Sequence, residues 1–163
     1  MKFLTAQSLA PAAFAPFGTV VQAPGAAGRV INGGSARRHD LVPDLALSAE
    51  GGRAGLALFQ ASARSFPYHV DELECHRLGS QAFIPLGRRR FVVVVAPAAP
   101  RPDPGALAAF VTDGEQGVVL APGTWHHALL AVDAGDFVVV ERIAEAVDCD
   151  VVRWDHGVCA VHV

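Results

Sequence analysis

The sequence predicts an all-β domain, and three observations support this fold class. Short apolar runs rich in Val and Phe recur along the chain between Gly, Pro and Asp residues, which is the pattern of strands joined by turns. Helical signals are confined to two brief segments, so a doubly wound sheet with alternating strands and helices is excluded. The length of 163 residues fits one domain. We therefore expect residues 1–163 to form a single β-sandwich or barrel with one or two short helices.

Eight segments carry the clearest strand pattern. Two stretches within them, residues 91–95 and 137–140, are apolar at every position. Because strand side chains alternate between two faces, such strands must be covered on both. We expect the barrel interior to cover one face, and a second layer or the partner in a homodimer to cover the other. The predicted strands are residues 55–63, 66–76, 81–86, 91–96, 117–120, 125–132, 137–142 and 149–154.

Two short helices are expected beside these strands. The first covers residues 5–17, with Thr5 as its N-cap and Gly18 as its stop signal. The second covers residues 103–111, where Asp103 would cap the helix, Pro104 would occupy its first position and residues 106–111 would continue it. The remainder of the pattern is strand-like.

Composition excludes several classes of protein. An apolar fraction of 52% with 18% charged residues excludes a disordered chain. The net charge of −3 argues against a nucleic-acid partner, which requires a concentrated basic surface. A membrane helix needs about 20 apolar residues in succession, and the sequence has no such run. Three cysteines without a Cys-x-x-Cys pair favour a reducing compartment, so we expect a cytoplasmic protein.

Residues 74–81 form the first cluster of polar side chains within a strand pattern. Strand alternation predicts that Glu74 and His76 share one face while Cys75 takes the other. A carboxylate beside an imidazole can bind a divalent metal or act as an acid–base pair. The same two residues are equally typical of a solvated hairpin end, so this pattern alone leaves both interpretations open.

Residues 121–127 form the second cluster. A turn at Gly123 leads into His126 and His127 at the start of a strand, which places one imidazole inward and the other outward. An inward histidine is either a ligand or a hydrogen-bonded core residue. The pattern does not distinguish the two.

The spacing of the two clusters resembles the paired metal motifs of cupin barrels. Glu74, His76, Gln81 and His126 stand at the four ligand positions of those motifs, although Glu74 replaces a histidine and Gln81 replaces a carboxylate. The resemblance implies a cupin-like double-stranded β-helix of jelly-roll type. It also implies a divalent metal, with nickel, manganese or zinc suited to this mixed set, and no organic cofactor.

Five longer strings carry a second resemblance, in order along the chain from residue 14 to about residue 149. They are residues 14–18, 32–38, 73–86, 123–131 and 136–142. Together these strings resemble the ureidoglycolate lyase family, also known as ureidoglycolate hydrolase, of the allantoin branch of purine catabolism. Four positions depart from the family pattern: Cys75, Arg77, Glu141 and Asp148.

This resemblance implies a carbon–nitrogen lyase that splits ureidoglycolate into glyoxylate and urea. The reaction needs a proton acceptor for the hydroxyl, a proton donor for the departing nitrogen, and an anchor for the carboxylate. Arg38 is the candidate anchor, because a guanidinium binds a carboxylate through two parallel hydrogen bonds. Glu74 or Glu141 is the candidate base, and His127 is a candidate acid if the strand twists it inward. The other substrate-binding candidates are Asn32 and Ser80.

Two alternative functions remain open from the sequence. Another metal-dependent cupin enzyme, such as an isomerase or a dioxygenase, has the same fold, although the substituted ligand set argues against a tightly held iron centre. A non-catalytic barrel that binds a metabolite is the second alternative, and the substituted ligands are its main support.

Overall fold

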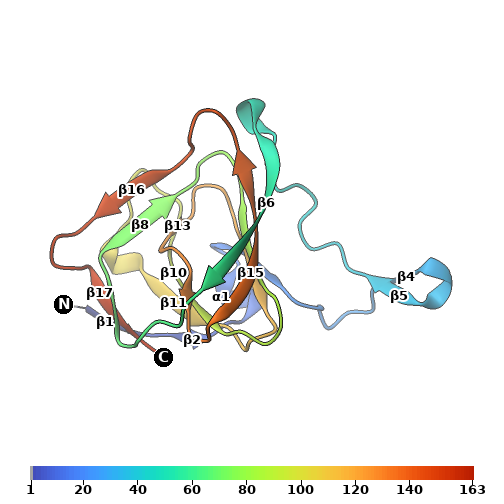
Figure 1. Ribbon diagram of the computed structural model, residues 1–163, viewed down its shortest axis with the longest axis horizontal. Coiled ribbons are helices and arrows are strands. Elements are labelled where there is room, and N and C mark those ends of the chain that lie inside the picture. The colour runs from blue at the N-terminus through green and yellow to red at the C-terminus, as the bar shows by residue number, and fades with distance from the viewer. Residues whose placement is uncertain (1) are drawn as a thin grey trace.

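The computed structural model describes residues 2–163 and has a cupin-like all-β fold (Figure 1). The helical elements are α1 (Pro11–Phe14) and the 3-10 turns η1 (Asn32–Gly34), η2 (Ala49–Gly51) and η3 (Pro104–Ala106). The strands are β1 (Lys2–Thr5), β2 (Gln7–Ser8), β3 (Gly18–Val21), β4 (Arg29–Ile31), β5 (Ala36–Arg38), β6 (Arg53–Ala61), β7 (Tyr68–Val70), β8 (Glu72–Cys75), β9 (Gln81–Pro85), β10 (Phe91–Ala96), β11 (Ala108–Val111), β12 (Gly117–Leu120), β13 (Trp125–His126), β14 (Leu130–Ala131), β15 (Gly135–Ile143), β16 (Asp150–Arg153) and β17 (Cys159–His162).

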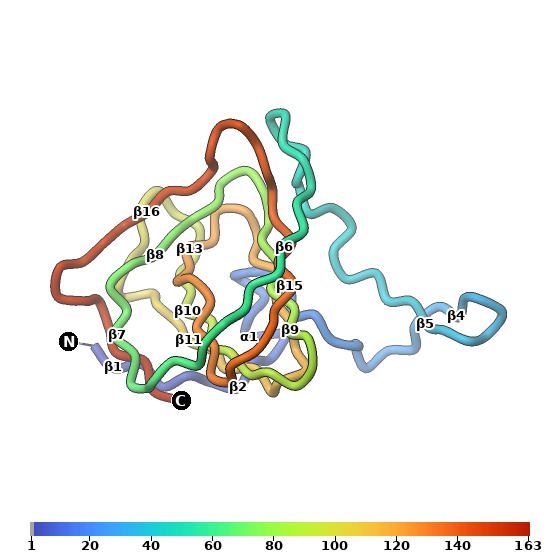
Figure 2. Tube along the Cα trace, viewed as in Figure 1, coloured from blue at the N-terminus to red at the C-terminus, as the bar shows by residue number. Residues whose placement is uncertain are grey.

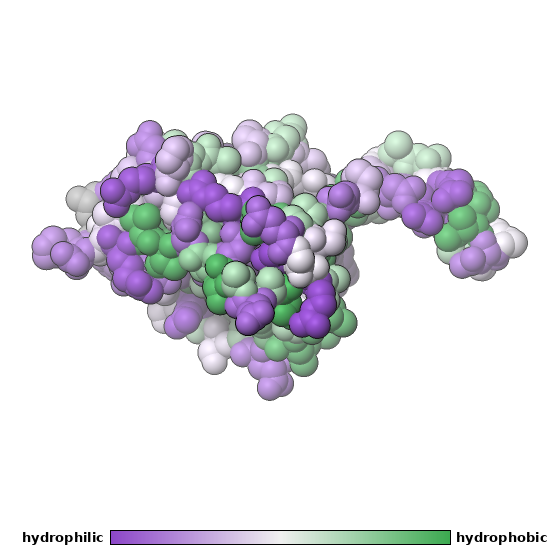
Figure 3. Space-filling view, turned by 90° about the horizontal axis from the view of Figure 1, so that it is seen from above, coloured by the Kyte–Doolittle hydropathy of each residue, from purple (hydrophilic) through white to green (hydrophobic). Residues whose placement is uncertain are grey.

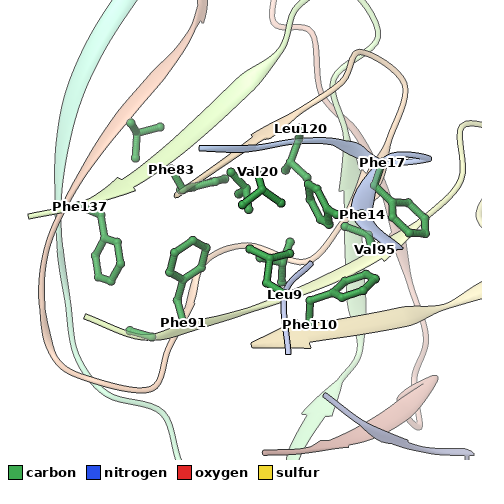
Figure 4. Close-up of a cluster of buried hydrophobic side chains, with 14 residues drawn as sticks. Leu9, Phe14, Phe17, Val20, Phe83, Phe91, Val95, Phe110, Leu120 and Phe137 are labelled. Carbon is green, nitrogen blue, oxygen red and sulfur yellow. The ribbon is translucent and has the colours of Figure 1, made fainter. Parts of the chain in front are cut away.

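Two sheets enclose the main core. One, the barrel sheet, has the strand order β3-β12-β9-β15-β6, and the other has the order β16-β8-β13-β10-β11-β2 with β14 on β10. Large aromatic side chains fill the space between them (Figure 4). Phe91 of β10 and Phe137 of β15 meet edge to face with ring centroids 5.6 Å apart, which is a favoured aromatic geometry.

A second core covers the opposite face of β10. Its alternate residues Val92 and Val94 pack in a cluster with Trp125, Cys159 and Val161. The latter two belong to a third sheet, of order β1-β17-β7. The predicted cover on both faces of residues 91–95 is therefore confirmed, and the second layer is a sheet of the same chain.

The outer face of the barrel sheet is apolar but exposed. Leu56 and Leu58 of β6 are 77% and 55% exposed. They lie opposite Val140 and Val138 of β15, which are half-buried. The second cover expected for residues 137–140 is thus absent among residues 2–163.

Strands β4 and β5 form a projecting arm, defined here as residues 22–44. The two strands pair with each other through Arg29↔Arg38 and Ile31↔Ala36, and within residues 2–163 they pair with no further strand. At the tip, Asn32 and Gly33 adopt positive φ angles of 52° and 64°, which these residue types tolerate. The arm stands clear of the barrel in two perpendicular views (Figures 2 and 3).

The first predicted helix is largely wrong. The helix is limited to Pro11–Phe14, and the residues before it form strands β1 and β2. Strand β1 pairs in parallel with β17, from Lys2↔Cys159 to Thr5↔His162. Within the predicted helix, Gln7 and Ser8 of β2 pair in parallel with Phe110 and Val111 of β11, and this pairing with a distant strand overrides the local helical pattern.

The second predicted helix is also shorter than expected. Asp103 is a cap as predicted, since its Oδ1 accepts a hydrogen bond of 2.7 Å from the Gly105 N–H. The helical turn ends at Ala106, and residues 108–111 form β11 instead, because they pair with β10. The apolar run therefore completes a sheet rather than a helix.

The eight predicted strand regions all contain strands, but two of them are divided. Residues 66–76 form β7 and β8, and residues 125–132 form β13 and β14. The first break occurs because β7 pairs with β17 while β8 pairs with β13 and β16, so the chain passes from one sheet to another. Local alternation cannot show such a change of partner.

The aromatic core generates a prediction about stability. Phe137→Ala should lower the free energy of unfolding by about 3–5 kcal/mol, because it leaves a cavity at a fully buried site. Phe3→Ala removes the same side chain at a site that is 69% exposed and should cost at most about 1 kcal/mol. Urea unfolding at equal protein concentrations measures both. Similar losses for the two variants would contradict this placement of the core.

Candidate active site

Three metal-ligand side chains converge between β8 and β13. These strands pair antiparallel, and the register sets His126 directly opposite Glu74. His76 follows β8, and one ligand atom from each of the three side chains lies within 4.8 Å of the others. Cys75 is buried in the second core, so the predicted division of faces between Glu74 and His76 on one side and Cys75 on the other is confirmed.

His76 directs one ring nitrogen, Nε2, at this cluster. Its Nδ1 lies 2.7 Å from the carbonyl oxygen of Asp148, and this acceptor holds the proton on Nδ1. Its Nε2 is buried and has no hydrogen-bond partner in the described chain; the nearest Glu74 oxygen is 4.0 Å away. A buried polar atom without a partner costs free energy, and a ligand at this point would remove that cost.

His126 is surrounded by oxygen atoms. Its Nδ1 lies 3.0 Å from the Thr124 carbonyl, while its Nε2 lies 3.0 Å from Gln81 Oε1 and 3.3 Å from Glu74 Oε1. The orientation of the Gln81 amide is fixed, because its Nε2 donates to Glu141 Oε2 at 2.9 Å. Two acceptors facing one imidazole nitrogen require either a second proton on His126 or a cation that they share with that nitrogen.

The donor set fits a divalent metal. Ligand atoms of Glu74, His76 and His126 lie within 4.8 Å of one another, and Gln81 Oε1 lies 3.0 Å from His126 Nε2. These are the four positions that the resemblance to cupins implies. Three ligands of a single ion at about 2.1 Å lie about 3–4 Å from one another, so movements of up to about 1 Å bring the cluster to coordination distance. A cation there would give His76 Nε2 its missing partner. It would also bind the Gln81 and Glu74 oxygens that face His126 Nε2.

Electrostatics keep the Glu74 carboxylate charged. The hydrogen bond from His126 lowers the pKa of Glu74, and the charges of His126 and His76 add to this effect against the opposing effect of burial. Cys149 Sγ lies 3.8 Å from Glu74 Oε2. Burial and the nearby Glu74 charge raise the pKa of Cys149 to about 11, so it remains a thiol at neutral pH and is not an activated nucleophile.

A cleft of about 220 Å³ opens beside the cluster. His76, Ser80 and Glu141 line it, together with Gly79 and with residues 142–144 and 146–149, which lie at the end of β15 and in the segment after it. Glu141 and Ser80, which the sequence analysis named as candidate site residues, both lie at this cleft. Glu141 is tied to the cluster through its hydrogen bond with Gln81.

Three other predicted residues are not brought to the cluster of the same chain. The His127 ring packs edge-on against Tyr68 with centroids 5.3 Å apart, and burial lowers its pKa, so the condition for its role as an acid is not met. Asn32 and Arg38 lie on the arm, and Arg38 pairs with Asp40 at 2.7 Å in the exposed part of the hairpin. The family resemblance implied a substrate-binding role for Asn32 and Arg38 but did not show that the arm carries them outward.

Asp148 is a positioning residue that sequence analysis did not assign. Its carboxylate accepts the backbone N–H groups of Arg77 and Leu78 at 2.8 and 2.7 Å, and its carbonyl orients His76. The sequence marks Asp148 only as a departure from the family pattern. No local signal could have revealed contacts that join two distant parts of the chain.

Comparison with known proteins bears directly on this site. The family model described as ureidoglycolate lyase matches residues 1–161. The chain belongs to the ureidoglycolate lyase family. The resemblance seen in the sequence is therefore confirmed, and family membership extends over the whole barrel and the arm.

Several relatives match over most of their length. A ureidoglycolate lyase of Azotobacter vinelandii (strain DJ / ATCC BAA-1303) is 41% identical over 151 residues, covering 92% of this chain and 91% of that protein. One of Burkholderia mallei (strain NCTC 10229) is 48% identical over 144 residues, covering 87% and 84%. One of Stutzerimonas stutzeri (strain A1501) is 42% identical, covering 92% and 89%.

The ligand geometry generates a prediction about metal binding. Calorimetric titration of chelator-treated protein with nickel, manganese or zinc should show one ion per chain. His126→Ala should weaken binding at least about tenfold, because it removes a ligand and exposes the oxygen pair. The neighbouring His127→Ala should leave the affinity unchanged. Equal effects of the two substitutions, or no binding by the parent protein, would contradict the site.

Proposed function

We propose that this protein is a cytoplasmic ureidoglycolate lyase that releases urea and glyoxylate in the breakdown of allantoin. The convergence of Glu74, His76 and His126 beside a cleft lined by Glu141 carries the proposal. Family membership over residues 1–161 supports the same activity. The cysteines are free thiols, which agrees with a reducing compartment.

The reaction breaks the bond between C2 of ureidoglycolate and a urea nitrogen. A proton leaves the C2 hydroxyl as the oxygen forms the carbonyl of glyoxylate. The electron pair of the C–N bond moves to nitrogen, which takes a proton and departs as urea. Water is not consumed and no external oxidant takes part, so the site must supply proton transfer and an anchor for the carboxylate.

Glu141 is our candidate for the proton transfer. One of its oxygens accepts the Gln81 hydrogen bond, and its position in the cleft leaves the carboxyl group able to take the hydroxyl proton and return it to nitrogen. Glu74, His76, Gln81 and His126 would hold a divalent cation. When bound, such a cation lowers the pKa of a coordinated hydroxyl and orients the bond that breaks.

Urea release from ureidoglycolate tests this function. Glu74→Gln and His76→Ala should each lower kcat at least about a hundredfold, the usual range for groups that handle protons or orient the reacting atoms. Their effects should be strongly non-additive, because the two residues act as one unit. Thermal unfolding of each variant shows whether the fold survives.

A matched control lies on the same strand. Glu72→Gln changes a carboxylate of β8 that pairs with Arg153, and it should leave turnover within about twofold. Release of ammonia in place of urea would indicate amidohydrolase chemistry. Full turnover by the His76→Ala protein would overturn the proposed site while leaving the family assignment intact.

We further propose that the protein is a homodimer formed through the outer face of the barrel sheet. Leu56 and Leu58 form an exposed apolar strip on β6, which is an edge strand of that sheet. Exposed edges and large apolar patches promote association. A second copy is the occupant best suited to this face, because twofold symmetry pairs the strip with itself.

Light scattering at micromolar concentration tests the dimer. The expected mass is twice the 17.0 kDa of one chain, and a stable interface should bury at least about 1,000 Å². Leu58→Glu should yield monomers, since it places a charge in the centre of the strip. Phe3→Glu makes the same kind of change at an exposed site on the third sheet and should remain dimeric. A monomeric parent protein would refute the proposal.

A further inference from the structure

We propose that the arm of one copy closes the cleft of the second copy in the dimer, so that Arg38 anchors the carboxylate of a substrate bound by the partner. The inference rests on the proposed function, because it identifies where that site obtains its carboxylate anchor. It concerns residues 22–44, which the described barrel does not use.

The cleft lacks a suitable anchor of its own. Among the described residues that line it, Arg142 is the cationic one, and its guanidinium already donates to the carbonyls of Ala49 at 2.8 Å and Glu50 at 3.1 Å. The lining also carries the carboxyl groups of Glu141 and Asp148. An anionic substrate therefore requires a cation from elsewhere, with both arms of its guanidinium available.

The arm carries exposed cations. Arg29, Arg37 and Arg38 are exposed. Arg38 forms an ion pair with Asp40, and the side chains of the two residues are 56% and 64% exposed, respectively. Exposed pairs of this kind contribute little free energy, so Arg38 can exchange Asp40 for a carboxylate ligand at small cost. The basic arm and the acidic cleft are thus complementary in charge.

The arm also needs a surface to pack against. An isolated two-stranded hairpin is at best marginally stable in water, and β4 and β5 pair only with each other among residues 2–163. Val30 on β4 is 53% exposed, and hydrophobic surface is visible on the arm (Figure 3). Docking on another molecule would bury this surface and stabilise the hairpin.

The position of the arm favours the partner's cleft over its own. The arm begins after β3 and leads back to β6, and these strands are the two edges of the barrel sheet whose outer face would meet the second copy. It points away from its own barrel (Figure 1). The segment between Val21 and Asn32 can span at most about 36 Å when extended, which is enough to cross the surface of a neighbouring barrel.

Closure over its own cleft would require the arm to reverse. The returning chain is fixed at the rim of that cleft, because the Ser80 N–H donates to the Leu45 carbonyl at 3.0 Å and Arg142 holds Ala49 and Glu50. Residues 39–44 would have to turn back sharply to bring Arg38 inside. Exchange between two copies uses the arm in the direction it already takes.

Purified heterodimers test the exchange through activity. One chain carries Arg38→Ala and the other carries Glu74→Gln, with a different affinity tag on each chain. Each homodimer should lose at least about tenfold in kcat/KM, since a charged hydrogen-bond anchor or an essential carboxylate is missing. If the arm is exchanged, one site of the heterodimer regains both residues, and its kcat/KM should be about half that of the parent dimer.

The matched control is a heterodimer of Arg37→Ala with Glu74→Gln. Its kcat/KM should be about half that of the parent dimer whether the arm serves its own cleft or the partner's, because one site keeps both Arg38 and Glu74 in either case. A heterodimer of Arg38→Ala with Glu74→Gln that stays as inactive as its parent homodimers would overturn the exchange and indicate closure within one chain. An Arg38→Ala homodimer with unchanged KM would overturn the role of Arg38 as the anchor.

Oxidative cross-linking tests the same geometry without activity. Val147 lies on the rim of the cleft and is 86% exposed. The free thiol of Cys149 lines the same cleft, so the test uses a Cys149→Ser chain. With Arg38→Cys and Val147→Cys added, this chain should form covalent dimers on a non-reducing gel; with Arg38→Cys alone it should not. Cross-links confined within one chain, or none, would overturn the exchange. Because this result does not depend on ureidoglycolate, a parent protein that fails to release urea would refute the proposed function separately.

Discussion

The antiparallel pairing of β8 with β13 fixes most of the site, because one register serves both faces of the sheet. It sets Glu74 opposite His126 on the side of the cluster and Cys75 opposite Trp125 on the side of the second core. A shift of one residue would exchange these faces, exposing the tryptophan and burying the carboxylate without its partners. The apolar contacts of the second core therefore hold the ligand atoms in position.

Two imidazole nitrogens of the cluster lack the partners that their surroundings call for. One imidazole nitrogen of His76 lacks a partner in the described chain, and one of His126 faces two oxygen acceptors. Asp148 and Thr124 fix the opposite nitrogens of the two rings through backbone carbonyls. Carbonyl groups commonly orient the imidazoles of metal sites, so both the ligand atoms and their supports fit the proposed cation site.

The two faces of the barrel are covered differently, and this asymmetry connects the fold to assembly. The strand that spans Phe91–Ala96 is covered inside by the main core and outside by the third sheet. The barrel sheet has no such layer among residues 2–163. The arm leaves this sheet at β3, one of its edges, and returns at β6, the other edge, which carries the strip at Leu56 and Leu58. A second copy would cover the strip, give the arm a surface to pack against and supply the cleft with a carboxylate anchor.

The sequence by itself determined the fold class, most strand positions and the shared face of Glu74 and His76, because alternation and turn residues act locally. The spacing that resembles the cupin motifs also indicated Gln81 and His126 as candidate metal ligands. The tertiary structure decided which strands pair, and therefore that β1 is a strand, that Asp148 orients a histidine, and that the arm carries Arg38 away from its own cluster. These outcomes depend on contacts between distant parts of the chain, whose free energy outweighs local propensity and leaves no local signal in the sequence.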